Sequence, residues 1–475
     1  MRKNLFYNTL LSVSNILFPI MSFPYAARIL GPQGIGKAQF IFSFAQYFAL
    51  FAALGIPLYG IKAIASIKDQ KQKLATTFFE LTTIYFIASL LISIIYLIVI
   101  FTIPFFEKDQ KLYLVAGLLT ILSFSNTDWY YTGIESFKTI SIRSIAVKMI
   151  SLLLLYLFVT SSSDLLYYLF VLVFSILGNQ LYSLIDIISK NRFKGIQPEY
   201  KKHIQPLLYI FGATLASSIY TIWDTLFLGF LSTETAVGFY TAAVKLTKLV
   251  IPVVLIIGSV MMPKIAFHFS NNQHEESKRL IKQSYQFTIL ATIPITIGLI
   301  LLAPELIYIF SGKLFLGATV TMQIISFLPL LVGLGHLFAF QVLIPMGKNK
   351  EVFISMLAGL CVSIITNFIL VPILNDKGTA IATVFTEIIV TGMYLYYVKQ
   401  FLQMNYQFKL ILQSLALAIV FIPIILLTRS TIHNVFIMTI VSIFTCVIFY
   451  FGFQHFIFNN KAIYQFMFEK NEMPD

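Results

Sequence analysis

The sequence predicts an all-α protein that crosses a membrane many times. Of its 475 residues, 58% are hydrophobic and only 11% are charged, whereas a soluble domain carries about 25% charged residues. Apolar runs of about twenty residues, the length that a helix needs to cross a bilayer, recur from one end of the chain to the other. An outer-membrane barrel would instead show alternating apolar and polar residues. These observations indicate a polytopic helical membrane protein.

The apolar runs predict about fourteen transmembrane helices joined by short connections. We place them at residues 9–27, 38–60, 78–102, 112–134, 143–161, 165–188, 207–230, 238–261, 285–303, 318–345, 352–372, 378–398, 409–428 and 433–455. The N-terminal residues Met1-Arg2-Lys3 lead into the first run without a small-residue cleavage site, which predicts a retained helix and not a removed signal peptide.

The distribution of basic residues predicts that both termini are cytoplasmic. With the N-terminus inside, 24 of the 33 lysines and arginines fall in segments on the inner side and seven on the outer side. Lysine and arginine gather in cytoplasmic loops of membrane proteins. The net charge of +13 therefore indicates membrane topology, and we expect no nucleic-acid partner.

The stretch Phe23–Tyr47 contains a glycine-rich turn, Gly31–Gly36, that has a degraded second copy in the chain. In the second copy, at Phe230–Lys245, Ala236-Val237-Gly238 corresponds to Gly34-Ile35-Gly36. The offset of roughly 200 to 215 residues equals about six spans, and an even number of spans gives parallel repeats. We expect two parallel six-helix bundles at residues 1–200 and 201–400, followed by an extra helix pair and a cytoplasmic tail at 401–475.

Several basic residues fall inside the predicted spans or at their ends. Charges in a membrane are costly and mark functional sites unless they reach the interface or pair with one another. Arg28, at the outer end of the first span, either snorkels to the surface or lines a cavity. Lys245 and Lys248 share one helix face. They either face a water-filled cavity or form an internal ion pair with Asp224.

Acidic residues also lie within predicted spans. Asp128 belongs to the polar run Ser125–Tyr131, which also contains Asn126 and Tyr130. This run either faces a lumen or contributes to the inner aromatic belt. Glu387, in the middle of the twelfth span, either carries a proton or cation or stays protonated and hydrogen-bonded. Glu80 lies near an inner span end and is interpreted as an ordinary interfacial residue.

The sequence contains no motif for catalysis on a soluble cofactor or metal. It has neither a GxxxxGK[ST] phosphate loop nor an HExxH or Cys/His cluster. Its two cysteines, Cys361 and Cys446, lie in apolar runs and indicate no disulfide framework. We therefore predict a protein that is not an enzyme, with no catalytic residues, no metal site and no cofactor.

Several segments resemble the polysaccharide repeat-unit flippases of the Wzx type. The most specific segment is PYAARILGPQGIGKAQF, at residues 24–40. The other matching segments are Trp129–Glu135, Asp224–Lys245 and Gly378–Thr383 leading to Glu387. The resemblance covers the first twelve spans, and the last two match only in being hydrophobic.

This resemblance implies the multidrug/oligosaccharidyl-lipid/polysaccharide exporter fold, with two six-helix bundles around a central cavity. It implies a bacterial cytoplasmic (inner) membrane protein that carries undecaprenyl-diphosphate-linked oligosaccharide repeat units to the outer leaflet by alternating access. The polymer would be O antigen, capsule or exopolysaccharide. Expected partners are this glycan lipid, the bilayer, H⁺ or Na⁺ as a coupling ion, and the polysaccharide polymerase and chain-length machinery.

Within that function, the polar residues receive three expected roles. Cations that can hold the diphosphate are Arg28, Lys245 and Lys248. Residues that can contact the sugars are Gln39, Gln46, Asn126 and Tyr130. Acidic residues that can couple transport to an ion are Asp128, Asp224 and Glu387.

Three alternatives remain at the level of sequence. A multidrug or cation antiporter of the same superfamily would favour an acidic, aromatic cavity, whereas the deep charges here lean basic. A lipid II flippase would share the fold. A membrane glycan polymerase would be an enzyme with catalytic residues in a long outer loop, and the predicted outer loops are short.

Overall fold

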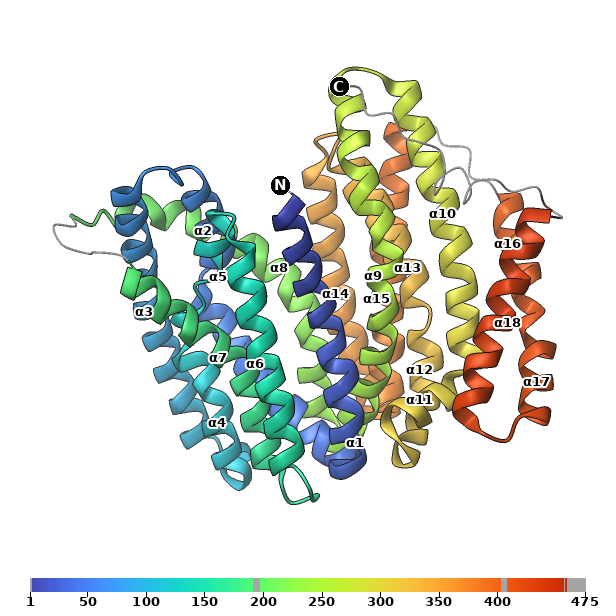
Figure 1. Ribbon diagram of the computed structural model, residues 1–475, viewed down its shortest axis with the longest axis horizontal. Coiled ribbons are helices and arrows are strands. Elements are labelled where there is room, and N and C mark those ends of the chain that lie inside the picture. The colour runs from blue at the N-terminus through green and yellow to red at the C-terminus, as the bar shows by residue number, and fades with distance from the viewer. Residues whose placement is uncertain (1, 191–196, 403–407, 457, 459–475) are drawn as a thin grey trace. The chain divides into compact units, whose positions relative to one another are not determined.

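The computed structural model describes residues 2–190, 197–402, 408–456 and 458. The described residues are almost entirely helical and contain no β-strand, so the all-α prediction is confirmed. Contacts divide the chain into two compact units, Met1–Gly238 and Phe239–Asp475, and within each unit the helices pack side by side (Figure 1).

The described residues of the first unit form eight α-helices, two 3₁₀ turns and the beginning of a ninth helix. Its elements are α1 (Arg2–Ala53), α2 (Ile56–Ala65), α3 (Lys71–Thr102), η1 (Pro104–Asp109), α4 (Gln110–Ile121), η2 (Ser123–Ser125), α5 (Asp128–Gly133), α6 (Phe137–Phe158), α7 (Leu165–Lys190), α8 (Lys201–Leu231) and the start of α9 (Glu234–Ser270).

Helix α1 is two helices joined at a sharp bend. Gly31 has φ 67° and ψ 178°, a backbone conformation that glycine adopts without the steric penalty of a Cβ. Next to the bend, Tyr25 donates a hydrogen bond to the carbonyl of Val159 at 3.0 Å. Lys37, just beyond it, pairs with Asp109 at 2.9 Å and with Glu234 at 3.0 Å. These three partners belong to the connections that follow α6, α3 and α8. The bend and these connections are therefore at the same end of the unit.

The predicted span 112–134 is broken in the structure. α4 ends at Ile121, a 3₁₀ turn covers Ser123–Ser125, and a short helix, α5, begins at Asp128. The break leaves Asn126 and Thr127 outside regular helix, where their polar groups are available to side chains of neighbouring helices. Thr127 donates a hydrogen bond to the Ser183 hydroxyl of α7 at 2.7 Å.

Opposite the α1 bend, a buried carboxylate holds the beginning of α8. Glu80 of α3 is fully buried. One of its oxygens accepts hydrogen bonds from the backbone N–H of Glu199 at 2.6 Å and from Lys202 at 3.0 Å. The other lies 2.9 Å from Nε2 of His203, whose Nδ1 lies 2.8 Å from the hydroxyl of Tyr59. Glu80 is therefore a buried structural anchor and more than an ordinary residue of a span end, while its predicted position near the membrane interface stays a prediction.

The second unit contains more short helices than the first unit does. It contains the rest of α9, then α10 (His274–Leu301), α11 (Ala303–Ser311), η3 (Lys313–Ala318), α12 (Thr319–Ile325), α13 (Leu328–His336), a π-helical turn η4 (Leu337–Leu343), α14 (Asn349–Leu374), α15 (Asp376–Phe401), α16 (Phe408–Ile419), α17 (Phe421–Thr431) and α18 (Val435–Phe456).

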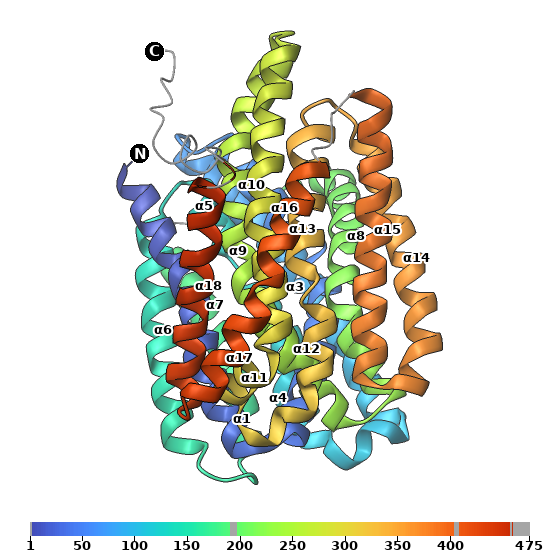
Figure 2. The same ribbon diagram turned by 90° about the vertical axis from the view of Figure 1, so that its right-hand side faces the viewer.

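Helices α16 and α17 pack against α10 in the second unit, and α18 packs against α17 and α11 (Figure 2). Phe421 and Ile425 of α17 and Tyr450 of α18 are buried in the same apolar core as Ile289 and Ile293 of α10. Arg429 at the end of α17 also pairs with Glu305 of α11 at 2.8 Å. The predicted helix pair after residue 401 is thus an integral part of this unit, while the predicted cytoplasmic tail lies outside the described residues.

Eleven helical runs in the described part of the chain are long and apolar enough to cross a membrane. Each of the fourteen predicted spans overlaps a described helix. Some of these helices are broken, and α1 holds most of two predicted spans. The number of crossings, the cytoplasmic termini and the domain boundaries at residues 200 and 400 stay predictions.

One predicted boundary differs from the structure in a way that affects the site. The fifth span was expected to begin at residue 143, but α6 begins at Phe137. Arg143 and Lys148, which lie at the beginning of the predicted span and belong to the 24 basic residues assigned to the inner side, are therefore deeper in the helix than predicted.

Candidate functional site

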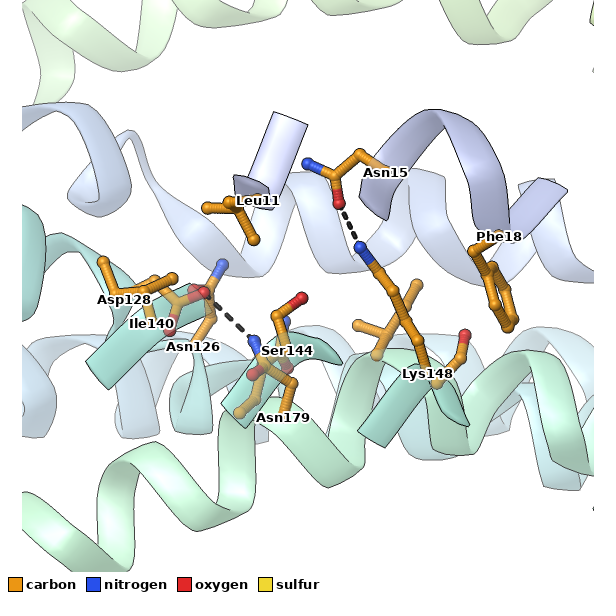
Figure 3. A pocket seen from close by; sticks show the side chains of 12 residues that line it. Leu11, Asn15, Phe18, Asn126, Asp128, Ile140, Ser144, Lys148 and Asn179 are labelled. Atoms are coloured by element: carbon orange, nitrogen blue, oxygen red, sulfur yellow. Dashed lines mark hydrogen bonds between the residues drawn. The ribbon is translucent and has the colours of Figure 1, made fainter. Parts of the chain in front are cut away.

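The first unit contains a polar cavity of about 400 Å³. Four segments line it: α1, the connection before α5, α6 and α7 (Figure 3). The lining residues are Leu11, Asn15, Phe18, Asn126, Asp128, Ile140, Ser144, Lys148, Ser175, Ile176, Asn179 and Gln180. Most of these side chains end in an amide, a hydroxyl or a charged group, which is an unusual lining among apolar helices.

The helical period explains why these residues meet. Ile140, Ser144 and Lys148 are four residues apart on α6, so they occupy one face of that helix. Ser175 and Asn179 have the same spacing on α7. The cavity is therefore built from the facing stripes of adjacent helices, closed from the opposite side by α1 (Figure 3).

A buried ion pair forms one end of the cavity. The guanidinium of Arg143 pairs through Nη2 with the carboxylate of Asp128. Its Nε also donates a hydrogen bond to Oδ1 of Asn179 at 2.7 Å. Asn179 in turn donates from Nδ2 to the second carboxylate oxygen of Asp128 at 3.2 Å. The three side chains close a ring of interactions that joins α5, α6 and α7.

The ring explains how two charges persist inside apolar helices. The side chain of Arg143 is 4% exposed and that of Asp128 is 34% exposed. Burying an unpaired charge costs far more than burying a paired one with its hydrogen bonds satisfied. Only the carboxylate side of the pair reaches the cavity, because Asp128 and Asn179 line it whereas Arg143 does not.

Lys148 is the second cation of the site, and its hydrogen-bond partners are neutral side chains. It donates hydrogen bonds to the Ser14 hydroxyl at 3.1 Å and to the side-chain carbonyl oxygen of Asn15. It lies about 16 Å along α6 from Phe137, at about 1.5 Å of rise per residue. The ammonium is thus near the middle of the helix, far from either end.

Such a lining can bind a polar, uncharged group beside an anion. Amide and hydroxyl side chains exchange hydrogen bonds with hydroxyl-rich ligands, and an ammonium forms charge-assisted hydrogen bonds with phosphate oxygens. Nothing in the described residues groups three or more metal-binding side chains.

Two of the residues predicted from the sequence, Asn126 and Asp128, line this cavity. Tyr130, expected to contact sugars, is 7% exposed and packs its ring on Phe78 with centroids 5.3 Å apart. It lies in the apolar core of the first unit together with Trp129.

The three predicted residues of α1 do not line this cavity. Arg28 is exposed, and its Nη1 donates a hydrogen bond to the carbonyl of Pro24 at 3.0 Å. Gln39 donates to the Ser43 hydroxyl at 3.1 Å, and Gln46 is half-buried. Their expected roles stay predictions.

The remaining predicted residues are distributed over both units. Asp224 is buried on α8 in the first unit. Lys245 is half-buried and Lys248 is exposed on the part of α9 that belongs to the second unit, and Glu387 is half-buried on α15 of that unit. The pairing of Asp224 with the two lysines also stays a prediction.

With the fold and the cavity described, comparison with known proteins identifies the family. Residues 1–269, more than half of the chain, match the family described as polysaccharide biosynthesis protein. The chain belongs to this family. The resemblance to Wzx-type polysaccharide flippases, predicted above from the sequence, is confirmed by this match and by the relatives that follow.

Two relatives match this chain over most of its length. A candidate O-antigen transporter of Escherichia coli K12 is 27% identical over 411 residues, which cover 84% of this chain and 97% of the relative. A candidate O-antigen transporter of Shigella dysenteriae is 24% identical and covers 82% of this chain and 98% of its own. A candidate low-salt glycan biosynthesis flippase of Haloferax volcanii is 22% identical over half of each chain. These relatives are named as transporters or flippases and not as enzymes.

Solved structures show the same fold. The lipid II flippase MurJ in an inward-closed conformation matches with a TM-score of 0.76 at 17% identity, covering 96% of this chain and 99% of its own. An inward-facing multidrug resistance transporter of the MATE family, in the MOP superfamily, matches with a TM-score of 0.62 at 15% identity, covering 81% of this chain and 93% of its own. The chain therefore has the same fold as these two solved transporters. Its many long apolar helices and its transporter relatives indicate a multi-pass membrane protein.

Sequence reasoning did not find several residues of this site, among them the cations Arg143 and Lys148 and the amides Asn179 and Gln180. The two cations fall in the first residues of the predicted span 143–161, and were counted with the inner-side charges. The adjacent amides Asn179-Gln180 interrupt the apolar run of the sixth span. The signal that could have found the site is the four-residue spacing of polar groups on the fifth and sixth spans.

Proposed function

We propose that this chain is a flippase for lipid-linked glycans. It carries undecaprenyl-diphosphate-linked oligosaccharide repeat units from the cytoplasmic to the outer leaflet of the bacterial cytoplasmic membrane, for the synthesis of O antigen, capsule or exopolysaccharide. The polysaccharide polymerase and chain-length machinery then receive the translocated unit. The chain itself catalyses no covalent step.

The observation that carries this proposal is the similarity to candidate O-antigen transporters over nearly their whole length. A shared domain alone would not support a shared cargo, whereas this match extends over 97% of the relative. The likeness to the lipid II flippase supports the fold that such transport needs.

The geometry of the first unit is compatible with this cargo. A repeat unit combines sugars, a diphosphate and a long isoprenoid chain. The cavity offers amide and hydroxyl groups for the sugars and one ammonium for an anion. An antiporter for cationic drugs would favour an acidic lining, and here the carboxylate of Asp128 is already compensated by Arg143.

The proposed mechanism is alternating access driven by an ion. Arg28, Lys245 and Lys248 are proposed to hold the diphosphate during transfer, and Gln39, Gln46, Asn126 and Tyr130 to contact sugars. Asp128, Asp224 and Glu387 are the acidic groups proposed to couple transport to H⁺ or Na⁺. Asp128 can serve in this role only if its pair with Arg143 opens during the cycle.

A deletion strain tests the function. We expect loss of the surface polymer and accumulation of complete undecaprenyl-linked repeat units on the cytoplasmic leaflet. Single repeat units exposed on the outer surface would indicate a polymerase instead. An unchanged polymer together with altered drug sensitivity would indicate an antiporter.

A further inference from the structure

Two cavities of different polarity meet at the same lysine in the first unit. The polar cavity described above and an apolar groove of about 200 Å³ share Phe18 and Lys148 in their linings. The groove runs between the first half of α1 and α6 and is lined by Leu10, Val13, Ser14, Leu17, Phe18, Met21, Ile145, Lys148, Met149 and Leu152. Lys148 therefore has polar space on one side and apolar space on the other.

The groove is accessible at the surface of the unit along much of its length. Val13, Leu17 and Met21 are about half exposed, and Met149 is 60% exposed. The positions on α1 recur at three- and four-residue intervals, so they form one continuous apolar stripe. Only Ser14 and Lys148 contribute polar groups to it.

The electrostatics of Lys148 differ from those of Lys37 and Arg143, two other cations of this unit. Lys37 is paired with the carboxylates of Asp109 and Glu234, and Arg143 with that of Asp128. Among the described residues, Lys148 has only the neutral oxygens of Ser14 and Asn15 as hydrogen-bond acceptors. A cation inside a membrane helix normally pairs with an anion, so the site is complementary to an anionic ligand.

We propose that this composite site binds the polyprenyl end of the lipid-linked glycan. The isoprenoid chain lies in the groove between α1 and α6, a phosphate contacts Lys148 together with Asn15, and the adjoining sugar occupies the polar cavity. This site is additional to Arg28, Lys245 and Lys248. The inference rests on the flippase function proposed above and assigns part of its cargo to residues of α1, α6 and α7.

The polar cavity favours this occupant over an ordinary phospholipid. Its volume of about 400 Å³ falls within the usual range for small-ligand sites, about 300–1,000 Å³. Asn126, Asn179, Gln180 and Ser175 extend the polar lining beyond Lys148. A glycosyl phosphate can hydrogen-bond to these groups, whereas a simple phospholipid head group supplies few partners at that depth.

The first test measures binding of undecaprenyl diphosphate to the purified full-length chain in nanodiscs, by native mass spectrometry. We expect Lys148→Gln to weaken binding by roughly tenfold or more, the size of one lost charge-assisted hydrogen bond. Lys148→Arg should keep most of the affinity. Lys138→Gln, an exposed lysine of the same helix, should leave it unchanged.

A second pair of variants tests the groove. Met149→Trp fills the groove and should weaken binding of undecaprenyl diphosphate, but not that of isopentenyl diphosphate, whose short chain cannot reach along it. Ile142→Trp places the same side chain at an exposed position of α6 outside the groove and should have no effect. Because Met149 is exposed, this substitution tests the groove even if Lys148→Gln reduces folding.

The possible outcomes distinguish a failure of the proposed lipid site from a failure of the proposed flippase function. If the wild-type chain binds phosphatidylglycerol as tightly as undecaprenyl diphosphate, and Lys148→Gln weakens both equally, the site is a general phospholipid site and the inference is overturned. Unchanged binding by both Lys148→Gln and Met149→Trp also overturns it, although a deletion strain that loses its polymer would still support the flippase function. A deletion strain with normal polymer would reject the function itself.

Discussion

Gly36 and Gly238 allow two backbone segments of the first unit to approach each other in a reciprocal way. A Cβ on Gly36 would lie 1.7 Å from the carbonyl oxygen of Glu234, and a Cβ on Gly238 would lie 2.0 Å from the carbonyl oxygen of Pro32. The number of residues between Gly36 and Gly238 equals the number between Pro32 and Glu234. The two contacts therefore join equivalent positions of the two segments. The sequence comparison of the two glycine-rich turns aligns the same two glycines. Small residues commonly permit such close helix contacts in membranes.

The first prediction concerns this crossing. Gly36→Ala and Gly238→Ala should each destabilise the protein by about 1–3 kcal/mol, the usual cost of forcing extra atoms into a packed site. The two losses should be similar because the contacts are reciprocal. The thermal midpoint of the purified protein in detergent measures the effect.

Gly212 provides the matched control for the glycine variants. It lies on α8, and a Cβ there meets nothing within 4 Å. Gly212→Ala should therefore be neutral or slightly stabilising, since alanine favours helix by up to about 1 kcal/mol over glycine. Thermal midpoints of Gly36→Ala and Gly238→Ala that match this control would show that the crossing is not closely packed.

The second prediction concerns the ring formed by Asp128, Arg143 and Asn179. Asp128→Asn leaves the guanidinium of Arg143, which is 4% exposed, without its carboxylate. We expect a loss of about 3 kcal/mol in unfolding free energy, typical of an uncompensated buried charge. Arg143→Gln should cost less, because the carboxylate that it leaves is 34% exposed and can be solvated from the cavity.

A double-mutant cycle decides whether the pair acts as a unit. The double variant Asp128→Asn/Arg143→Gln should be less destabilised than the sum of the single variants. The exposed pair of Lys68 and Glu135, with side chains 46% and 60% exposed, serves as the control, and Glu135→Gln should change stability by less than about 1 kcal/mol. Strictly additive losses for Asp128 and Arg143 would contradict the coupling.

The third prediction concerns the anchoring of α8. In Glu80→Gln the side chain loses the charge that holds the N–H of Glu199, Lys202 and His203. We expect backbone amides of residues 199–203 to exchange hydrogen about tenfold faster, equivalent to about 1.4 kcal/mol. Hydrogen–deuterium exchange measured by mass spectrometry checks this. Glu107→Gln, an exposed carboxylate in η1, should leave the rate unchanged, and equal rates in both variants would remove Glu80 as the anchor.

The features of the fold that were predictable from the sequence are those that the lipid bilayer imposes on it. A spanning helix must be apolar over about twenty residues, and Gly31 with its neighbours indicated the turn inside α1. The break between α4 and α5 was not predictable in this way. Its residues, Ser123–Thr127, are compatible with helix, and the break is stabilised by a tertiary contact of Thr127 with Ser183 of α7.

The candidate site was predictable only in part, for a related reason. Asp128 was recognised because a carboxylate inside an apolar run is costly. Its partner Arg143 lies at the edge of an apolar run, where the same charge is equally suited to a cytoplasmic loop. The true start of α6 at Phe137 places Arg143 and Lys148 deeper in the helix than the predicted start at residue 143 does. Hydrophobicity alone could not supply that boundary.

The fourth prediction tests the orientation inferred from the positive charges. The turn that contains Asp69 and the connection that contains Ser162 are exposed at opposite ends of the first unit. In a chain with Cys361→Ser and Cys446→Ser, a membrane-impermeant maleimide should label Ser162→Cys in intact spheroplasts. It should label Asp69→Cys only after permeabilisation. The reverse pattern would place the N-terminus outside, against the distribution of basic residues.

The fifth prediction concerns ion coupling in the second unit. Glu387 is half-buried near the middle of α15, where a carboxylate can take up a proton or bind Na⁺ only if the transport cycle exposes it. The measurement is transport of extracted undecaprenyl-linked repeat units into proteoliposomes under an imposed pH or sodium gradient. The wild-type rate should rise with the gradient, and Glu387→Gln should lose that dependence because its amide neither titrates nor carries charge.

Glu351→Gln is the control for Glu387, since this carboxylate lies in the first turn of α14 and not mid-helix. It should transport with the wild-type gradient dependence. If Glu387→Gln also keeps that dependence, the coupling site must be sought at Asp128 or Asp224. Asp128 could then couple transport only by releasing Arg143, so an Asp128→Asn variant that folds but no longer responds to the gradient would assign the coupling ion to the first unit.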